Sequence, residues 1–248
     1  LPAKTEMLSY CALSSEQVRL YQQSVAELAQ QLQMQTEGIK RRGLVLSYLM
    51  RFKQICNHPA QWLGHGDYSP EQSGKFLQLK ALCETIHLKQ EKVLVFTQFR
   101  EIIPALSDFL SDVFQQPGLF LDGQTSIKER TRRVASFQQE EGPAFFVLSL
   151  KAGGVGLNLT RASHVIHFDR WWNPAVENQA TDRAYRIGQK NPVMVHKFLC
   201  LGTIEEKIAL LLDTKKTLSD DLLDTHQEVN LTELSNEDLL KMVTLDIH

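Results

Sequence analysis

The sequence lacks the features of a membrane-spanning or secreted protein. No apolar run among its 248 residues approaches the roughly 20 needed to cross a bilayer, and the start, LPAKTEMLSY, has no signal-peptide core. Its four cysteines are scattered without a C-x-x-C pair, which is typical of reduced, buried thiols and not of a disulfide framework. We therefore expect a chain with no membrane partner that works inside the cell.

Two phosphate-binding motifs and a metal site are also incomplete. SLKAGGVGLNL does not make G-x-G-x-x-G, because Leu159 stands in the place of the third glycine. EQSGKFLQ is not a Walker A loop, because Phe76 follows the Gly-Lys pair where serine or threonine is needed. In CNHPAQWLGH, Cys56, His58 and His65 have no fourth ligand at suitable spacing, so no metal site is expected.

The chain has little net charge, but its charged residues are unevenly spread. The net charge is −2, and the stretch from Asp213 to the end holds nine acids and three lysines, which leaves +4 for residues 1–212. Basic side chains gather at KRR (40–42) and in SIKERTRR (126–133). A short basic cluster is usually a solvated helix face, so these clusters indicate nucleic acid only with support from a motif.

The first section, to about residue 75, is predicted to be mostly helical. TEMLSYCAL alternates like a short strand, and SSEQVRLYQQSVAELAQQLQ then has a helical period with Ser14 and Gln17 as a possible capping box. A second helix is expected through GLVLSYLMRFKQICN and ends before Pro59. GHGDYSPEQSG is a loop by its glycines, proline and polar residues.

Buried strands alternate with helices from there on. KVLVFT, GLFLD, FFVLSL, HVIHFD and VMVHKFLC have the apolar character of strands, and helical segments separate them. This order predicts an α/β fold with a parallel sheet covered by helices on both faces. Ligands of such sheets bind beyond the carboxyl ends of the strands, where the loops TQF, KAGGVGLNL and RWWNP are expected. The tail after TIEEKIALLLDTKK is predicted to be helical and acidic.

The run PAVENQATDRAYRI is predicted to be one helix, with Asn173 as its cap and Gly188 as its stop. Its apolar stripe would pack on the sheet: Val176, Ala180, Ala184 and Ile187. A second stripe would carry Gln179, Arg183 and Arg186, with Asp182 bracing the last of these. Arginine suits phosphate because its planar fork is always charged. The alternative is a pair of solvated arginines.

The neighbouring loops favour phosphate binding by the stripe of Gln179, Arg183 and Arg186. The glycines of SLKAGGVGLNL follow a buried strand directly and can line a phosphate with N–H groups, although a glycine loop alone is more often a tight turn. Trp171 and Trp172 could stack on nucleic-acid bases, but packing is the more common role.

Several motifs occur together in a fixed order: QICNHP, KVLVFTQF, DGQTSIKERTRRVASF, SLKAGGVGLNL and FDRWWNPAVENQATDRAYRIGQ. With them the chain resembles the C-terminal half of the SWI/SNF-type ATPase motor, a branch of the superfamily 2 helicases, from LPAKTE to TIEEKIALLLDTKK. The resemblance implies a RecA-like lobe over residues 76–212, preceded by a helical insertion over 1–75 and followed by an acidic helical tail over 213–248. Tyr185 and Asp122 depart from it, since many relatives have histidine at both places.

The resemblance also implies roles for individual residues. The positions that match DNA-contact motifs are Thr97, Gln98, Gly123, Thr125, Arg130, Ser149 and Lys151. The positions nearer the nucleotide are Gly154, Gly156 and Asn158. Gln179, Arg183 and Arg186 would face the γ-phosphate. ATP and Mg²⁺ would be bound mainly by an N-terminal lobe of the same protein, whose Walker A loop and acidic motif are absent here, so this chain alone should be inactive.

The implied function is ATP-driven translocation along double-stranded DNA, with remodelling of DNA-bound proteins. The location would be the cytoplasm (nucleoid) of a prokaryote or the nucleus of a eukaryote. One alternative is a strand-separating superfamily 2 helicase, against which WWNP and QICNHP argue. Another is a non-catalytic nucleic-acid-binding or regulatory module, against which the Arg183 and Arg186 pair argues. A self-contained α/β nucleotide-binding domain is the simplest alternative, but the chain has no phosphate cradle of its own.

Overall fold

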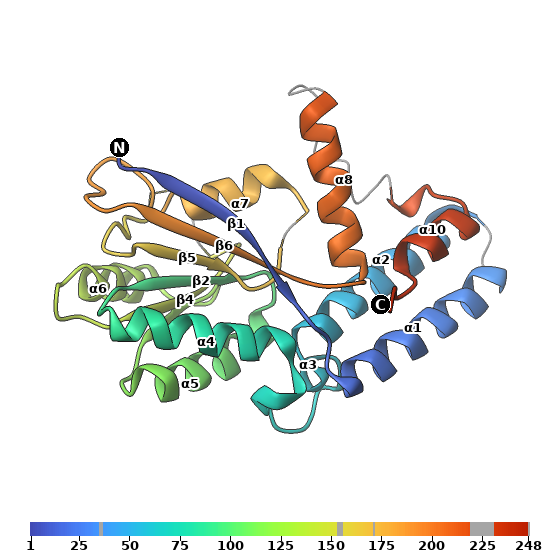
Figure 1. Ribbon diagram of the computed structural model, residues 1–248, viewed down its shortest axis with the longest axis horizontal. Coiled ribbons are helices and arrows are strands. Elements are labelled where there is room, and N and C mark those ends of the chain that lie inside the picture. The colour runs from blue at the N-terminus through green and yellow to red at the C-terminus, as the bar shows by residue number, and fades with distance from the viewer. Residues whose placement is uncertain (35–36, 153–155, 171, 219–230, 248) are drawn as a thin grey trace. The chain divides into compact units, whose positions relative to one another are not determined.

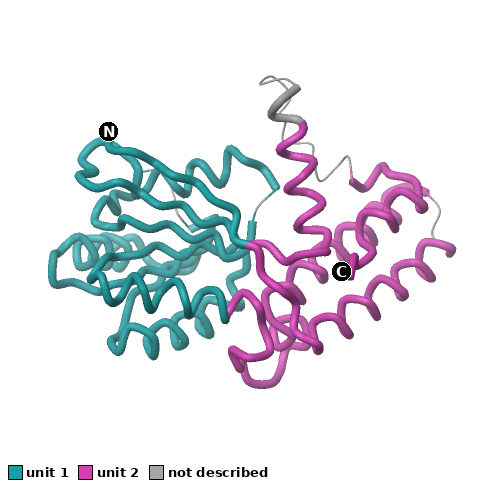
Figure 2. Tube along the Cα trace, in the orientation of Figure 1, with its two compact units in different colours: residues 1–9, 77–198 teal, residues 10–76, 199–248 magenta. Residues whose placement is uncertain are grey.

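The computed structural model describes residues 1–34, 37–152, 156–170, 172–218 and 231–247. The chain groups into two compact units, shown in teal and magenta in Figure 2. Unit 1 comprises residues 1–9 and 77–198, and unit 2 comprises residues 10–76 and 199–248. This grouping cuts across the three predicted parts, because the first strand joins the sheet and the C-terminal residues join the N-terminal helices. The three-part division stays a prediction.

The sheet has six strands in the order β1-β6-β5-β2-β4-β3 (Figure 1). The strands are β1 (Lys4–Cys11), β2 (Val93–Thr97), β3 (Leu119–Leu121), β4 (Phe145–Ser149), β5 (His164–His167) and β6 (Val193–Cys200). The pairs β2–β4, β2–β5, β3–β4 and β5–β6 are parallel. β1 runs parallel to β6 as well, because Val193 N donates to Ala3 O and Leu201 N to Cys11 O. The predicted parallel α/β fold is confirmed.

Helices cover both faces of the sheet, as predicted, because successive strand residues point to opposite sides. The Phe146 ring lies 5.6 Å from Phe137, at the end of α6 (Ile127–Phe137). The Phe145 ring lies instead 5.5 Å from Phe114, at the end of α5 (Ile103–Phe114). Figure 1 shows α5 and α4 (Gly74–Leu88) in front of the sheet and α6 and α7 (Pro174–Thr181) behind it.

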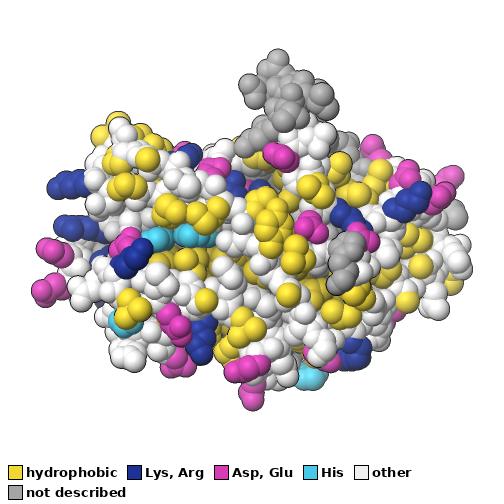
Figure 3. Space-filling view, viewed as in Figure 1, with side chains coloured by type: hydrophobic (Ala, Val, Ile, Leu, Met, Phe, Trp, Pro, Cys, Tyr) yellow, Lys and Arg dark blue, Asp and Glu magenta, His cyan; other side chains and the backbone are white. Residues whose placement is uncertain are grey.

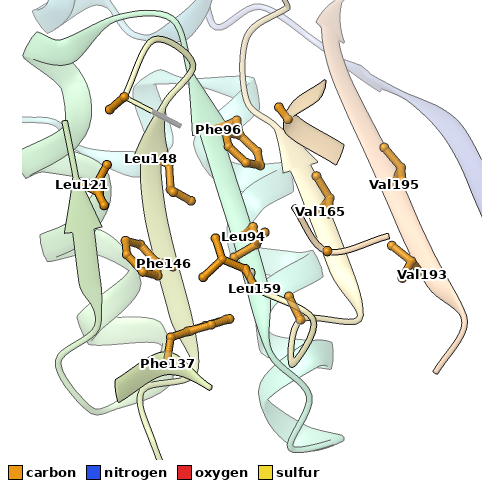
Figure 4. Packing of buried hydrophobic residues seen from close by; sticks show 14 residues of the cluster. Leu94, Phe96, Leu121, Phe137, Phe146, Leu148, Leu159, Val165, Val193 and Val195 are labelled. Carbon is orange, nitrogen blue, oxygen red and sulfur yellow. The ribbon is translucent and has the colours of Figure 1, made fainter. Parts of the chain in front are cut away.

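The face behind the sheet holds the cluster of buried apolar side chains drawn in Figure 4. Leu94 and Phe96 of β2 lie in its centre, and Ala180 of α7 belongs to the same cluster. All five residues of β2 and all five of β4 are buried, which explains why their sequences are continuous apolar runs. The core therefore fixes where the carboxyl ends of these strands emerge.

Unit 2 is built from helices at both ends of the chain. From the N-terminal side come α1 (Ser15–Met34), α2 (Gly38–Asn57) and the short α3 (Pro59–Leu63). The predicted capping box is confirmed, because Ser14 N donates to Gln17 Oε1 at 2.9 Å and Gln17 N to Ser14 Oγ at 3.1 Å. The Gln17 amide also donates to the carbonyls of Ile55 and Cys56, which ties α1 to the end of α2.

From the C-terminal side, α8 (Ile204–Leu218) and α10 (Asn236–Val243) join the same unit. The Tyr21 hydroxyl donates to Val243 O at 2.7 Å and accepts from Ile204 N at 2.9 Å. Arg41, from the basic KRR cluster, is buried and donates to the carbonyls of Thr232 and Leu234 at 2.6 Å. This arginine therefore holds distant segments together and is not a solvated basic residue.

The predicted helices and strands are largely observed. Two helices were not anticipated: α4, which follows the predicted loop, and α3, which begins at Pro59 with the His58 side chain as its cap. Part of the predicted acidic tail lies outside the described residues. Among the helices that the structure describes, none has the length and apolarity that crossing a bilayer requires. All four cysteines are free and buried, as predicted.

Candidate functional site at the carboxyl edge of the sheet

The strand ends bring the predicted site loops to one edge. In the parallel register, Thr97 at the end of β2 is the partner of Ser149 at the end of β4, and Phe96 is the partner of His167 at the end of β5. The loops that follow these strands therefore start side by side, as the sequence predicts. They carry most of the candidate residues.

The turn after β2 is held by a carboxylate that sequence reasoning missed. Asp169 is fully buried after β5, where it accepts from the Thr97 hydroxyl and from Gln98 N at 2.7 Å. The Thr97 oxygen also accepts from Phe99 N at 3.1 Å, and its side chain has no exposed surface. The Thr97 hydroxyl therefore shapes the turn in this structure, while the half-buried Gln98 lies at its tip. The only sequence signal for Asp169 is its place directly after a buried strand.

The DGQT segment forms a tight turn in front of α6. Asp122 O accepts from Thr125 N at 3.1 Å, Asp122 N donates to the Thr125 hydroxyl at 3.1 Å, and Gln124 N donates to the Asp122 carboxylate at 2.8 Å. Burial acts to raise the pKa of Asp122, but the Gln124 amide and the Arg100 guanidinium outweigh it and lower this pKa. Gly123 is exposed at the tip, with open space where a side chain would stand.

Arg130 joins this turn to the loop after β4. Its Nη1 donates to Ala152 O at 2.8 Å and its Nε to Thr125 O at 3.2 Å. Ser149 is buried, and its hydroxyl accepts from Ala152 N at 3.1 Å, whereas Lys151 is exposed. The structure thus gives Arg130 and Ser149 internal partners. They hold the backbone on which Lys151 and Gly123 are presented.

The glycine loop is only partly described. Gly154 lies outside the described residues. Gly156 has a φ of 99°, a conformation that glycine adopts without strain, and both Gly156 and Asn158 are exposed. Leu159 N donates to Arg183 O at 2.9 Å, so the end of this loop is bound to the segment after α7.

The start of α7 is as predicted. Asn173 Oδ1 accepts from Ala175 N at 3.0 Å, and Pro174 occupies the first turn. Behind it, Arg170 donates twice to the buried Glu177 carboxylate, at 3.0 Å each. Burial acts to raise the pKa of Glu177, but the Arg170 guanidinium outweighs it and lowers this pKa. Trp172 is buried, in line with packing, and Trp171 lies outside the described residues.

The predicted end of this helix is wrong: α7 ends at Thr181 and not at Ile187. Beyond Thr181 the backbone forms turns: Arg183 N donates to Ala180 O and Ala184 N to Thr181 O at 3.1 Å each, and Arg183 O accepts from Leu159 N at 2.9 Å. The apolar stripe therefore fails at Ile187, whose side chain is 91% exposed.

We call residues 182–188 the arginine segment. Its backbone forms turns, so Arg183 and Arg186 do not form a helical stripe. Arg186 Nη1 donates to Leu157 O at 3.0 Å, and the expected bracing by Asp182 is not among the ion pairs of the described residues. Arg183 is half-buried, and its Nε is a buried donor with no hydrogen-bond partner among the described residues. Gln179 is exposed on α7.

The pKa of Arg183 is lowered by its surroundings. Burial lowers the pKa of Arg183 first, the nearby charge of Arg186 lowers it further, and Asp182 opposes both. Like charges held together beside a buried, unsatisfied donor cost free energy unless an anion binds them. The arrangement is therefore suited to a phosphate group.

The groups that could bind a metal have other partners. Cys56, Cys200 and Glu205 offer ligand atoms within 4.8 Å of one another in unit 2. The buried Lys75 ammonium already lies 2.9 Å from the Glu205 carboxylate, and burial raises the pKa of the Cys200 thiol well above its usual value. His58 caps α3 through Ala60 N at 3.0 Å. The lysine that neutralises Glu205 and the protonated Cys200 thiol make this an internal network.

Unit 1 also has a cavity of about 920 Å³ away from the predicted site. Its lining residues include Lys92, His164 and Pro192, which lie at the amino ends of β2, β5 and β6, the edge opposite to the site loops. Figure 3 shows neighbouring histidine side chains (cyan) bordered by hydrophobic ones on the visible face of unit 1. His164 and His196 are stacked, with ring nitrogens 3.3 Å apart.

Comparison with known proteins agrees with this geometry. Residues 77–188 match the family described as helicase conserved C-terminal domain. The chain is 46% identical to YwqA of Bacillus subtilis over 99% of its own length, and 34% identical to the mouse DNA excision repair protein ERCC-6 over 84%. It spans 26% and 15% of those two proteins.

Two solved structures cover nearly the whole chain. The Sulfolobus solfataricus SWI2/SNF2 ATPase core in complex with dsDNA has a TM-score of 0.88 and 40% identity, over 100% of this chain and 51% of that one. The C-terminal domain of the Sulfolobus solfataricus SWI2/SNF2 ATPase has a TM-score of 0.83 and 38% identity, over 98% of this chain and 100% of that one. The chain therefore belongs to the SWI2/SNF2 family of superfamily 2 ATPases, and it is the C-terminal, RecA-like lobe.

Proposed function

We propose that this chain is the second motor lobe of an ATP-dependent translocase on double-stranded DNA, and that Arg183 and Arg186 act on the γ-phosphate of ATP held by a first lobe. The observation that carries the proposal is the unsatisfied Arg183 guanidinium: its Nε is buried and has no hydrogen-bond partner among the described residues, and burial, followed by the charge of Arg186, lowers the pKa of Arg183. A phosphate would supply the missing acceptor and the missing negative charge.

Phosphoryl transfer depends on positioning and charge stabilisation, which arginines provide without forming a covalent bond. Arg186 would act as the arginine finger, and Arg183 beside it would hold a second phosphate oxygen. Gln179, exposed on α7, would face the same group. Because the arginine segment is bound to the loop after β4 through Leu159 N and Leu157 O, the nucleotide side and the DNA side of the lobe would move together.

On the DNA side, the candidate residues divide by what their side chains already contact. Gln98, Gly123 and Lys151 lie at loop tips with exposed or half-buried surface, so they would meet the backbone phosphates directly. Thr97, Thr125, Arg130 and Ser149 have internal hydrogen bonds, so they would act by orienting backbone N–H groups. Phosphate contacts of this kind carry no sequence information and weaken with salt.

ATP would lie between this edge and the first lobe, with Gly156, Asn158 and the undescribed Gly154 on this side. Bound Mg²⁺ would neutralise the phosphate charge, and its ligands would come mainly from the first lobe. That the chain resembles a SWI2/SNF2 core in complex with dsDNA supports duplex DNA as the partner. DNA-bound proteins would be the objects that the motor moves.

The test uses the full-length protein and Arg186→Ala. ATP turnover stimulated by double-stranded DNA should fall by about 10³-fold or more, the scale of an arginine finger. Arg161→Ala is the matched control, because this exposed arginine lies before β5 at the opposite edge of the sheet and its loss should change turnover little. Near-normal turnover of Arg186→Ala would refute the role. The lobe alone should not hydrolyse ATP.

A second measurement decides the mode of action. A translocase on duplex DNA should displace a third strand from a triplex during ATP hydrolysis and leave a tailed duplex paired. Efficient unwinding of the tailed duplex would assign the chain to a strand-separating helicase. If the full-length protein hydrolyses no ATP in the presence of DNA, the chain is a non-catalytic module.

A further inference from the structure

Tyr185 lies between the two arginines, and its ring is anchored in the sheet. It packs against the buried apolar cluster that includes Leu94 and Ala184, and its N–H donates to Thr181 O at 3.0 Å. The ring is half-buried, so its hydroxyl can reach a partner at the surface of unit 1. The proposed phosphate site makes no use of this side chain.

The Tyr185 hydroxyl is bound to the beginning of the chain. It donates to Pro2 O at 2.7 Å, across 183 positions of sequence. The Lys4 ammonium lies 5.2 Å from the centre of the same ring, a cation–π distance. Between them, Ala3 O accepts from Val193 N at 3.0 Å, where β1 meets β6. The first residues of β1 therefore contact the arginine segment through one side chain.

The other hydrogen bonds of the arginine segment join it to residues near it in sequence and to the loop after β4. Arg183 N donates to Ala180 O at 3.1 Å and Tyr185 N to Thr181 O at 3.0 Å. Leu159 N binds Arg183 O, Arg186 Nη1 binds Leu157 O, and Gln189 binds Ala184 O. These bonds come from the loop after β4, from α7 and from Gln189, directly after the segment. Tyr185 supplies the bond to Pro2, just before β1, so a displacement of Pro2 would act directly between the two guanidinium groups.

We propose that Tyr185 is a positioning residue that couples the entry of the chain into β1 to the placement of Arg183 and Arg186. The inference rests on the proposed function, in which a first lobe precedes β1 in the same protein. When that lobe moves to close on ATP, the chain that enters β1 moves with it. Through Tyr185, the placement of the two arginines then depends on the position of the first lobe. ATP hydrolysis is thereby favoured only when the lobes have closed.

The test is Tyr185→Phe in the full-length protein, because this change removes one oxygen and keeps the ring in its packing site. At saturating DNA, kcat for ATP should fall about fivefold, the equivalent of about 1 kcal/mol for one neutral hydrogen bond, with little change in KM. Tyr10→Phe is the matched control, since Tyr10 lies on β1 itself and is 50% exposed. It should leave kcat unchanged. An unchanged kcat in Tyr185→Phe would overturn the proposal.

A double-mutant cycle separates positioning from general destabilisation. If Tyr185 acts through Arg186, Tyr185→Phe should have no further effect on the residual single-turnover rate of Arg186→Ala. An equal fivefold loss in both backgrounds would overturn the proposal, because it would mean that the hydroxyl acts elsewhere. Near-normal turnover of Arg186→Ala would instead refute the proposed function. Loss of activity in Arg186→Ala with full activity in Tyr185→Phe would refute only the coupling.

Discussion

Acidification should destabilise unit 1 through His167, the last residue of β5. Its side chain is fully buried, its Nε2 lies 3.1 Å from the Thr181 hydroxyl, and its Nδ1 has no hydrogen-bond partner among the described residues. Burial lowers the pKa of His167 from 6.5 to about 4; Glu177 opposes this, and the charges of Lys197 and Arg170 add to it.

The magnitude follows from the difference between the two states. Below pH 6.5 the unfolded chain binds a proton at His167 that the folded protein does not bind until about pH 4. The contribution to the free energy of unfolding is therefore complete above pH 6.5 and is lost as the pH falls to about 4. A shift of this size corresponds to about 3 kcal/mol.

The assay is urea unfolding between pH 7 and pH 4, followed by tryptophan fluorescence. His167→Leu removes the titrating ring at similar volume, so the stability of this variant should fall about 3 kcal/mol less over that range than the stability of the wild type. His65→Leu is the control at an exposed position. Parallel pH profiles for wild type and His167→Leu would refute the reasoning.

Two further predictions concern buried ion pairs. Glu177→Gln leaves Arg170 without its carboxylate, so the thermal midpoint of unit 1 should fall by an amount equivalent to about 3–5 kcal/mol, measured by calorimetry against exposed Glu101→Gln. Lys75→Met leaves the Glu205 charge buried and unpaired, with a similar cost in unit 2. A combined Lys75→Met, Glu205→Leu variant should recover much of that loss, and no recovery would show that the pair is not the source.

Local signals in the sequence predicted much of the fold. Ser14 with Gln17, and Asn173 with Pro174, lie within a few residues of the backbone groups that they bind, so their caps could be read directly. The buried strands were evident because both of their faces are covered. The carboxyl edge followed from the parallel order, and with it the neighbourhood of the candidate loops.

Long-range hydrogen bonds account for what sequence reasoning missed. The segment after α7 forms turns that are bound to Leu159 through the carbonyl of Arg183, and no local pattern shows that contact. The Thr97 hydroxyl donates to Asp169, 72 positions away in the sequence. Only the order of the strands in the sheet brings these two residues together. The Pro2 contact of Tyr185 depends on β1 lying beside β6, and a single strand at the N-terminus does not reveal its neighbour.

The hydrogen bonds that Arg41 and Tyr21 make to the C-terminal residues affect how the chain folds during its synthesis. Tyr21 and Val243 are 222 positions apart, and Arg41 and Thr232 are 191 apart. Unit 2 therefore cannot reach its native packing until the ribosome has synthesised nearly all of these residues, whereas most of unit 1 is one continuous stretch that can collapse earlier. During that interval the first helices expose an apolar face that the C-terminal helices cover in the native fold.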